Sequence, residues 1–300
     1  MSDDADKPQF HAHTSRFLSA LRSAEARTRF SARLIEKDYF CSVVLRELKD
    51  SFALGLVFKG GTSLSKVHAD FFRLSEDLDF AISISSVARR SARREAIEPC
   101  KRNFEAICNR MPWFRVDSPL TGHDDSRQYN AQLSYDSAVT GEPERLKIEI
   151  ALREEILVAP EERMARTILT DPETDDSVTP PLPVRVLTLD ETYAEKVRAA
   201  LTRRDPAIRD FFDVDEAVLR KRLAFDDPKF LELVVRKLAV SVHNPVDLSP
   251  GRIAVLRSQV ETQLLPVLRE IDLSAFDLDR VLALLTQVAQ HCGRITVQNS

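Results

Sequence analysis

One stretch, residues 58–80, constrains the possible folds of this chain more than any other. A short apolar run leads into the turn-forming sequence Gly-Gly-Thr-Ser at 60–63. Leu78–Ile84 then alternates apolar and polar residues, which is typical of a β-strand with one buried face. Asp77 and Asp79 share the other face, because side chains two residues apart project from the same side of a strand. The stretch therefore predicts a strand that runs into a tight turn, followed further along by a second strand with a pair of carboxylates on one face.

These elements suit an enzyme that handles a nucleoside triphosphate. Gly60 and Gly61 allow phosphates to approach the backbone closely, and the helix expected after the turn points its N-terminus at the same place. Thr62 and Ser63 add hydroxyls, although the spacing of a Walker A loop is absent. Paired carboxylates hold Mg²⁺ together with water and substrate oxygens. An ordinary turn and a solvated strand face are the alternatives for each motif alone, and their succession favours the nucleotide site.

A second alternating segment offers a third carboxylate. In Arg145–Leu152 the apolar side chains form one face, and Lys147 and Glu149 occupy the other. We therefore expect Glu149 to join Asp77 and Asp79 as a ligand for Mg²⁺ or Mn²⁺. An exposed sheet face would show the same pattern.

The remaining pattern predicts an N-terminal α/β half and a C-terminal helical half. Further strands are expected at 54–58, 128–135 and 184–187. Helices are expected at 14–29, 34–48, 63–72, 87–111, 190–203, 207–222, 228–242, 250–271 and 278–292. Pro99 should kink or divide its helix, and the proline-rich segment 171–183 is a linker or surface loop. The charged residues at 36–38 suit the first turn of their helix, where carboxylates interact favourably with the positive end of the helix dipole.

Composition excludes several classes of protein. A hydrophobic content of 43% and a charged content of 30% predict a folded core. No apolar run reaches the roughly 18 residues of a membrane helix, so we expect no membrane contact. The acidic residues 1–12 are expected to form a disordered tail, and four scattered cysteines fit reduced thiols in the cytoplasm. With a net charge of −4, the chain needs a local basic patch to bind a polynucleotide.

Two further groups of charged residues have open interpretations. The start of the helix at 87–111 is a candidate RNA-binding stripe or a solvated face paired with glutamates; its basic residues are Arg89, Arg90, Arg93, Arg94 and Lys101. In the helical half, Lys196 could reach a triphosphate and Asp210 could orient it. Pattern alone favours ion pairs on or between helices for these two.

Five blocks of the chain resemble, in order, the motifs of the AbiEii/AbiGii toxin family of nucleotidyltransferases. They are EKDYFCSVVLREL (36–48), FKGGTSLSKVH (58–68), RLSEDLDF (73–80), YAEKVRAALTRRD (193–205) and IRDFFDVDEA (208–217). The resemblance implies an α+β fold, with a DNA polymerase β-like nucleotidyltransferase core around a small mixed sheet, followed by a C-terminal helical bundle. The expected domains are 13–188, the nucleotidyltransferase domain, and 189–300, a helical domain contributing to the active-site cleft.

The resemblance also implies an activity. Members of the family are toxins of bacterial toxin–antitoxin or abortive-infection systems, encoded beside an AbiEi-type antitoxin. Characterised relatives transfer nucleotides from NTPs to RNA, including tRNA acceptor ends, and so block translation. We therefore expect a metal-dependent, monomeric, cytoplasmic enzyme that acts on tRNA.

Roles for individual residues follow from the resembling blocks. The implied nucleotide-binding residues are Gly60, Gly61, Thr62, Ser63, Lys66, Ser75 and Asp213. The implied catalytic residues are Asp77, Asp79, Lys196 and Asp210. The family's motifs do not single out Glu149, and they leave open which of Asp210 and Asp213 contacts the substrate.

Two other functions would use the same residues. A nucleotidyltransferase could modify a protein or a small molecule instead of RNA, in which case the basic stripe would be dispensable. A non-catalytic module could bind an NTP and sequester a partner, in which case the carboxylate pair would be dispensable. Phosphorylation of Thr62 or Ser63 is a further hypothesis for how such a toxin is restrained.

Overall fold

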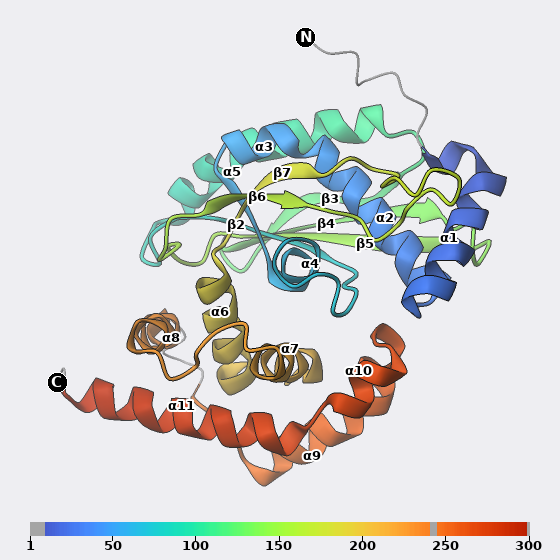
Figure 1. The fold of residues 1–300 in the computed structure, drawn as a ribbon. Helices are drawn as coiled ribbons and strands as arrows, with labels where there is room; N and C mark the ends of the chain where they lie inside the picture. Colours follow the sequence, from blue (N-terminus) through green and yellow to red (C-terminus); the bar gives the residue numbers. More distant parts are fainter. Residues whose placement is uncertain (1–9, 241–244, 299–300) are drawn as a thin grey trace. The chain divides into compact units, whose positions relative to one another are not determined.

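The computed structural model describes residues 10–240 and 245–298, which fall into two compact units (Figure 1). The sheet unit comprises Met1–Arg153 and Glu162–Val186, and the helical unit comprises Glu154–Glu161 and Leu187–Ser300. Within the described ranges, no helix is long and apolar enough to span a lipid bilayer.

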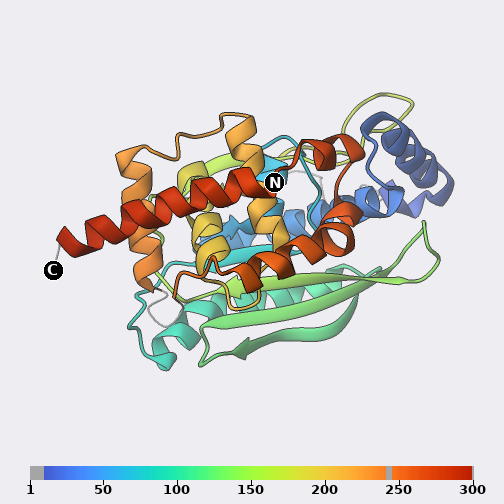
Figure 2. The same cartoon turned by 90° about the horizontal axis from the view of Figure 1, so that it is seen from below.

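The sheet unit is built on a seven-stranded mixed sheet with the order β3-β4-β5-β2-β1-β7-β6. The strands are β1 (Leu56–Lys59), β2 (Leu78–Ile82), β3 (Arg115–His123), β4 (Gln128–Asp136), β5 (Pro143–Ala151), β6 (Glu161–Ala165) and β7 (Leu182–Val186). The central strand β2 is antiparallel to β1 and parallel to β5. The long strands β3, β4 and β5, coloured green, run side by side (Figure 2). The predicted α+β class with a mixed sheet is confirmed.

Several helices pack against this sheet (Figure 1). They are α1 (Thr14–Thr28), α2 (Ala32–Glu47), α3 (Lys49–Ala53), α4 (Gly60–Ser63), the π-helical turn η2 (Leu64–His68) and α5 (Arg90–Arg110). Of the two effects predicted for Pro99, a kink or a division of the helix, the division is wrong, because α5 continues through this residue. On the apolar face of β2, the Phe80 ring lies 5.4 Å from Phe58 and 6.3 Å from Phe52 of α3. This packing leaves Asp77 and Asp79 on the opposite, polar face.

The helical unit contains α6 (Leu189–Thr202), α7 (Ile208–Leu219), α8 (Pro228–Val240), α9 (Pro250–Gln259), η3 (Val260–Leu264), η4 (Leu265–Val267), α10 (Glu270–Ala275) and α11 (Leu278–Gln298). The single helix predicted at 250–271 is wrong: α9 ends at Gln259 and passes through the π-helical η3 into η4, which contains Pro266 and ends at Val267. The segment 154–161 also belongs to this unit. Glu191 of α6 accepts hydrogen bonds from the backbone N–H groups of Leu157 and Val158.

The N-terminal segment is anchored through a histidine. Of the predicted tail, residues 1–9 lie outside the described residues, whereas Phe10–Ala12 form the short 3-10 helix η1. The His11 ring lies 5.1 Å from the rings of Phe40 and Trp113, and its Nδ1 lies 2.9 Å from the Tyr39 hydroxyl. Burial lowers the pKa of His11 to about 4, so the folded chain keeps this imidazole neutral.

We expect the anchoring of His11 to make stability depend on pH. Between pH 6.5 and 4 the unfolded chain binds a proton at His11 that the folded chain does not, so the free energy of unfolding falls as pH falls. The loss between pH 7 and pH 5 should reach about 2 kcal/mol. Urea unfolding of the wild type and His11→Phe at both pH values measures it. Parallel pH dependences of the two proteins would contradict the prediction.

Candidate active site

Asp79 lies in a row of polar residues that crosses the sheet. The strand register pairs Asp79 with Lys59 of β1 on one side and with Glu149 of β5 on the other. Asn130 of β4 is the next residue in the row, opposite Glu149. Because neighbouring strands lie about 4.8 Å apart, the side chains of Asp79 and Glu149 start next to one another on the polar face.

The glycine turn lies directly against Asp79. Gly60 has a φ of +76°, which favours glycine, and a Cβ at this position would lie 2.8 Å from Asp79 Cβ and closer still to its Oδ2. The chain turns there from β1 into α4, whose first-turn N–H groups have no partner within the helix. The two motifs on which the sequence interpretation depends therefore meet in space.

The hydroxyls of the turn point inward. Thr62 donates its hydroxyl to the Asp77 carbonyl oxygen, and Ser63 donates to the Gly60 carbonyl oxygen at 3.0 Å. Their exposed fractions are only 1% and 0%. The first bond fixes the turn to the residue that precedes β2, and the second lies within the turn itself. A kinase would reach either hydroxyl only after the turn opens.

Arg73 is a candidate site residue that the sequence interpretation missed. A Cβ on Gly61 would lie 2.6 Å from an Arg73 guanidinium nitrogen and 3.0 Å from Ser75 Oγ. Arg73 is 2% exposed, so its charge is buried beneath the turn. The residue opens the block RLSEDLDF, and this position beside Ser75 was the available signal.

Lys66 points into the core. Its side chain is 0% exposed, and its Nζ lies 2.5 Å from Asp38 Oδ1 and 2.8 Å from Ser42 Oγ. It also donates to the Asp38 carbonyl oxygen at 3.0 Å. A direct contact with a triphosphate would require the ammonium to leave these partners. The implied nucleotide-binding role of Lys66 stays a prediction.

The carboxylates are ligands of the type that a hard divalent cation prefers, but their side chains do not form a complete coordination shell. Asp77, Asp79 and Glu149 supply the oxygen ligands that Mg²⁺ and Mn²⁺ prefer. Glu149, however, is ion-paired with Lys147 at 3.0 Å and with Arg153 at 3.8 Å. No group of three or more His, Cys, Asp or Glu side chains in the described part of the chain is arranged to hold a metal. The donor set therefore suits an ion that keeps several water and substrate ligands.

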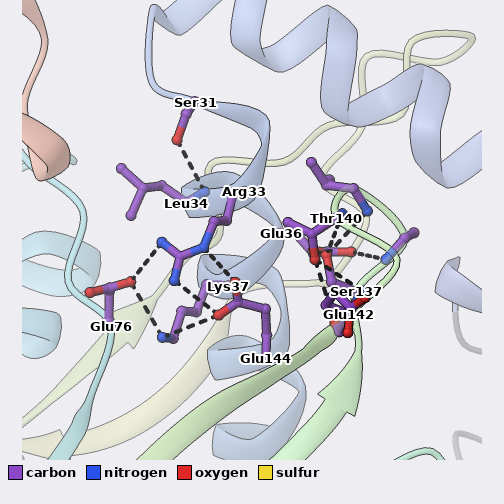
Figure 3. Close-up of polar contacts among 12 residues, drawn as sticks. Ser31, Arg33, Leu34, Glu36, Lys37, Glu76, Ser137, Thr140, Glu142 and Glu144 are labelled. Atoms are coloured by element: carbon purple, nitrogen blue, oxygen red, sulfur yellow. Dashed lines mark hydrogen bonds and ion pairs between the residues drawn. The ribbon is translucent and has the colours of Figure 1, made fainter.

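A network of charges holds the residue before Asp77 (Figure 3). Glu76 Oε1 accepts from Lys37 at 3.3 Å and from Arg33 at 3.4 Å. Arg33 also pairs with Glu144 at the start of β5, with its Nε 2.5 Å from Glu144 Oε1. The network ties α2 to the segments that enter both carboxylate-bearing strands.

The predicted residues of the helical unit form a compact cluster. Lys196 Nζ of α6 lies 2.8 Å from Asp210 Oδ1 and 2.8 Å from Asp213 Oδ2, both on α7. Arg203 adds a contact of 3.2 Å to Asp210 Oδ2. The Asp213 side chain is 0% exposed and that of Lys196 is 13% exposed. These three residues are thus together within one unit, as the turn and the carboxylates are within the other.

The arginine-rich start of α5 divides into two kinds of residue. Arg89, Arg90 and Arg94 are exposed. Arg93 is 2% exposed and donates to the Ser86 carbonyl oxygen at 3.1 Å. A buried guanidinium is not accessible to an RNA backbone. The exposed arginines and the half-buried Lys101 are therefore the candidate residues for contact with RNA.

The chain is similar to solved structures that share little of its sequence. Two solved structures from Helicobacter pylori, a candidate nucleotidyltransferase and the protein JHP933, each align at 15% identity with a TM-score of 0.45. Both alignments cover 100% of this chain, and they cover 99% and 96% of the chains of the two solved structures, respectively. No curated protein matches the chain significantly.

The family comparison is more specific. Residues 43–286 match the model described as nucleotidyl transferase AbiEii toxin, type IV TA system. This range includes the glycine turn, the carboxylate-bearing strands and the Lys196 cluster. The chain therefore belongs to the AbiEii family of nucleotidyltransferase toxins of type IV toxin–antitoxin systems.

Proposed function

We propose that this nucleotidyltransferase moves a nucleoside monophosphate from an NTP to an RNA, with a tRNA acceptor end as the leading candidate, and thereby blocks translation. The observation that supports the proposal most is the contact of the glycine turn with Asp79. It brings backbone suited to a triphosphate within reach of carboxylates suited to a metal. We further propose that the enzyme acts as a monomer in the cytoplasm, where NTPs and RNA occur together. Its partner would be an AbiEi-type antitoxin.

In the proposed mechanism each group has a separate task. The turn at Gly60–Ser63, together with Ser75, binds the triphosphate. Asp77 and Asp79 hold the divalent cation, with Glu149 as an additional ligand. When bound, the cation supplies charge neutralisation on the pyrophosphate and activation of the attacking hydroxyl. Lys196 neutralises further phosphate charge.

The aspartates of α7 set the position of Lys196. Two carboxylates at 2.8 Å hold the ammonium in one orientation. In this proposal, both Asp210 and Asp213 act through Lys196. Replacing either aspartate would therefore lower activity even if that aspartate does not contact the NTP.

The exposed arginines at the start of α5, Arg89, Arg90 and Arg94, contact the RNA backbone in this proposal.

The test is transfer of label from each of the four NTPs, labelled at the α-phosphate, to total tRNA. The wild type should label RNA with one or more NTPs. Arg90→Glu combined with Arg94→Glu should lower RNA labelling about tenfold or more, since it replaces two phosphate contacts by repulsion. The exposed pair Arg22→Glu and Arg29→Glu in and beside α1 is the matched control.

Other outcomes separate the remaining functions. Label appearing on a protein or small molecule, with no effect of the arginine reversals, would establish the alternative acceptor. Absence of any label, together with undiminished toxicity of Asp79→Asn in cells, would overturn RNA transfer and support a binding module.

A further inference from the structure

Lys147 lies among the carboxylates that the proposed function assigns to the metal. On β5 it precedes Glu149 by two residues, so both side chains project from the polar face. The parallel register sets Leu78 opposite Ile148 and Asp79 opposite Glu149. Asp77 precedes β2 by one residue, and its charge, like that of Asp79, acts on Lys147. An ammonium is thus built into the carboxylate group.

The charges of this group act on one another. Lys147 Nζ lies 3.0 Å from Glu149 Oε2. Burial lowers the pKa of Lys147, but the hydrogen bond and charge of Glu149 and the charges of Asp77 and Asp79 raise it, with a net rise. The charges of Glu149, Asp77 and Asp79 thus all act on the Lys147 ammonium. Its side chain is 48% exposed, so the ammonium has room to move.

An ammonium and a divalent cation compete for these carboxylates. The ion pair with Lys147 occupies an oxygen of Glu149, and its positive charge repels an approaching cation. A triphosphate bound at the neighbouring glycine turn would attract the same ammonium. Movement of Lys147 to the phosphates would free Glu149 Oε2 and remove the repulsion by the ammonium, while Arg153 would stay beside the other oxygen, Oε1, at 3.8 Å.

We propose that Lys147 keeps the carboxylate group in an ion-paired state that binds a divalent cation weakly until an NTP arrives, so that metal loading is coupled to NTP binding. The proposal rests on the proposed function of Asp77 and Asp79 as metal ligands. Lys147 acts here as a positioning residue, because it sets the availability of Glu149 and the charge of the site.

The test is Mn²⁺ binding by the full-length protein, measured by calorimetry without nucleotide. Lys147→Met should bind Mn²⁺ about tenfold more tightly than the wild type, whereas Lys147→Arg should bind like the wild type because it keeps the charge. Arg145→Met is the matched control, since Arg145 shares the strand and the face but lies one strand repeat further from Asp79. With an unreactive NTP analogue present, the wild type and Lys147→Met should differ by less than about threefold.

Two results would overturn the proposal, and they are distinguishable. If Lys147→Met binds Mn²⁺ no more tightly than the wild type while Asp79→Asn abolishes binding, Lys147 has no role in metal loading and the metal site stands. If Asp79→Asn binds Mn²⁺ like the wild type, the proposed metal site itself is wrong and the inference fails with it.

Discussion

Replacing Asp79 by Asn is expected to lower the rate of nucleotidyl transfer about a thousandfold while the sheet unit stays folded. The amide keeps the size of the carboxylate beside Gly60, where there is no spare room, but it loses the charge that a hard cation prefers. A thousandfold loss corresponds to about 4 kcal/mol of transition-state stabilisation, which is within the range for groups that neutralise developing charge.

The stability of this variant should change by less than about 1 kcal/mol. Asp79 is only half-buried, and its cross-strand neighbours Lys59 and Glu149 carry opposite charges, so removing its charge loses an attraction and relieves a repulsion. The measurement is single-turnover transfer of labelled nucleotide, with urea unfolding of the same preparation.

Glu142→Gln is the control for this prediction, because it makes the same change of charge on an exposed turn between β4 and β5. It should transfer nucleotide at the wild-type rate. Asp77→Asn should resemble Asp79→Asn, and the double variant should be only slightly slower than either, since residues that act as a unit are not additive. An Asp79→Asn protein that retains more than a tenth of the wild-type rate would exclude a metal-binding role.

Alternation was sufficient to predict β2 and the face that carries its aspartates. This strand lies in the middle of the sheet with one face buried, so its burial follows the two-residue period of the sequence. The edge strand β3 gave no such signal, because Leu120 is the single buried residue among its nine. Strand β6 escaped prediction for a similar reason, with burial only at Ala165. Edge strands of this kind are recognisable from their pairing and not from their pattern.

Charged residues were predicted less well than apolar ones. Glu36 and Asp38 were assigned to a helix first turn, but α2 begins at Ala32 and both are buried, 0% and 2% exposed. Glu36 accepts from Ser137 Oγ and the Ala138 N–H, about a hundred residues away. Such partners come from distant loops, and no local period encodes them. The burial of Arg93 was also missed; besides Ser86, its guanidinium lies 3.8 Å from Asp125, a residue outside its own helix.

Residues of the candidate active site were predicted from the sequence where they lie close together in the chain, and less well where they do not. The glycine turn and Asp79 are close in sequence, and their meeting follows from the antiparallel pairing of β1 with β2. For Lys196 and Asp210, the sequence pattern alone favoured an ion pair on or between helices. Only the resemblance to the family implied a catalytic role for them. The structure shows that ion pair, which the proposed mechanism uses to orient the lysine. The two interpretations are therefore compatible.

Replacing Lys66 by Met is expected to lower the free energy of unfolding by about 3–5 kcal/mol, because it leaves the Asp38 carboxylate buried without its counter-charge. Asp38 would keep two hydrogen bonds, from the Thr167 hydroxyl at 2.9 Å and from the Ile168 N–H at 3.2 Å. These are too few to compensate an isolated charge at 2% exposure. Urea unfolding at pH 7 measures the loss.

The double variant Lys66→Met with Asp38→Asn separates a structural role of Lys66 from nucleotide binding. An asparagine oxygen can still accept from Thr167 and Ile168 but carries no charge, so the double variant should recover at least about half of the lost stability. If Lys66 only supports the turn from within the core, the recovered protein should bind NTP with the wild-type KM. A KM raised about tenfold or more in a protein of near wild-type stability would instead show that the ammonium leaves Asp38 for the triphosphate. That result would restore the nucleotide-binding role implied by its sequence block, because stability and KM then change independently.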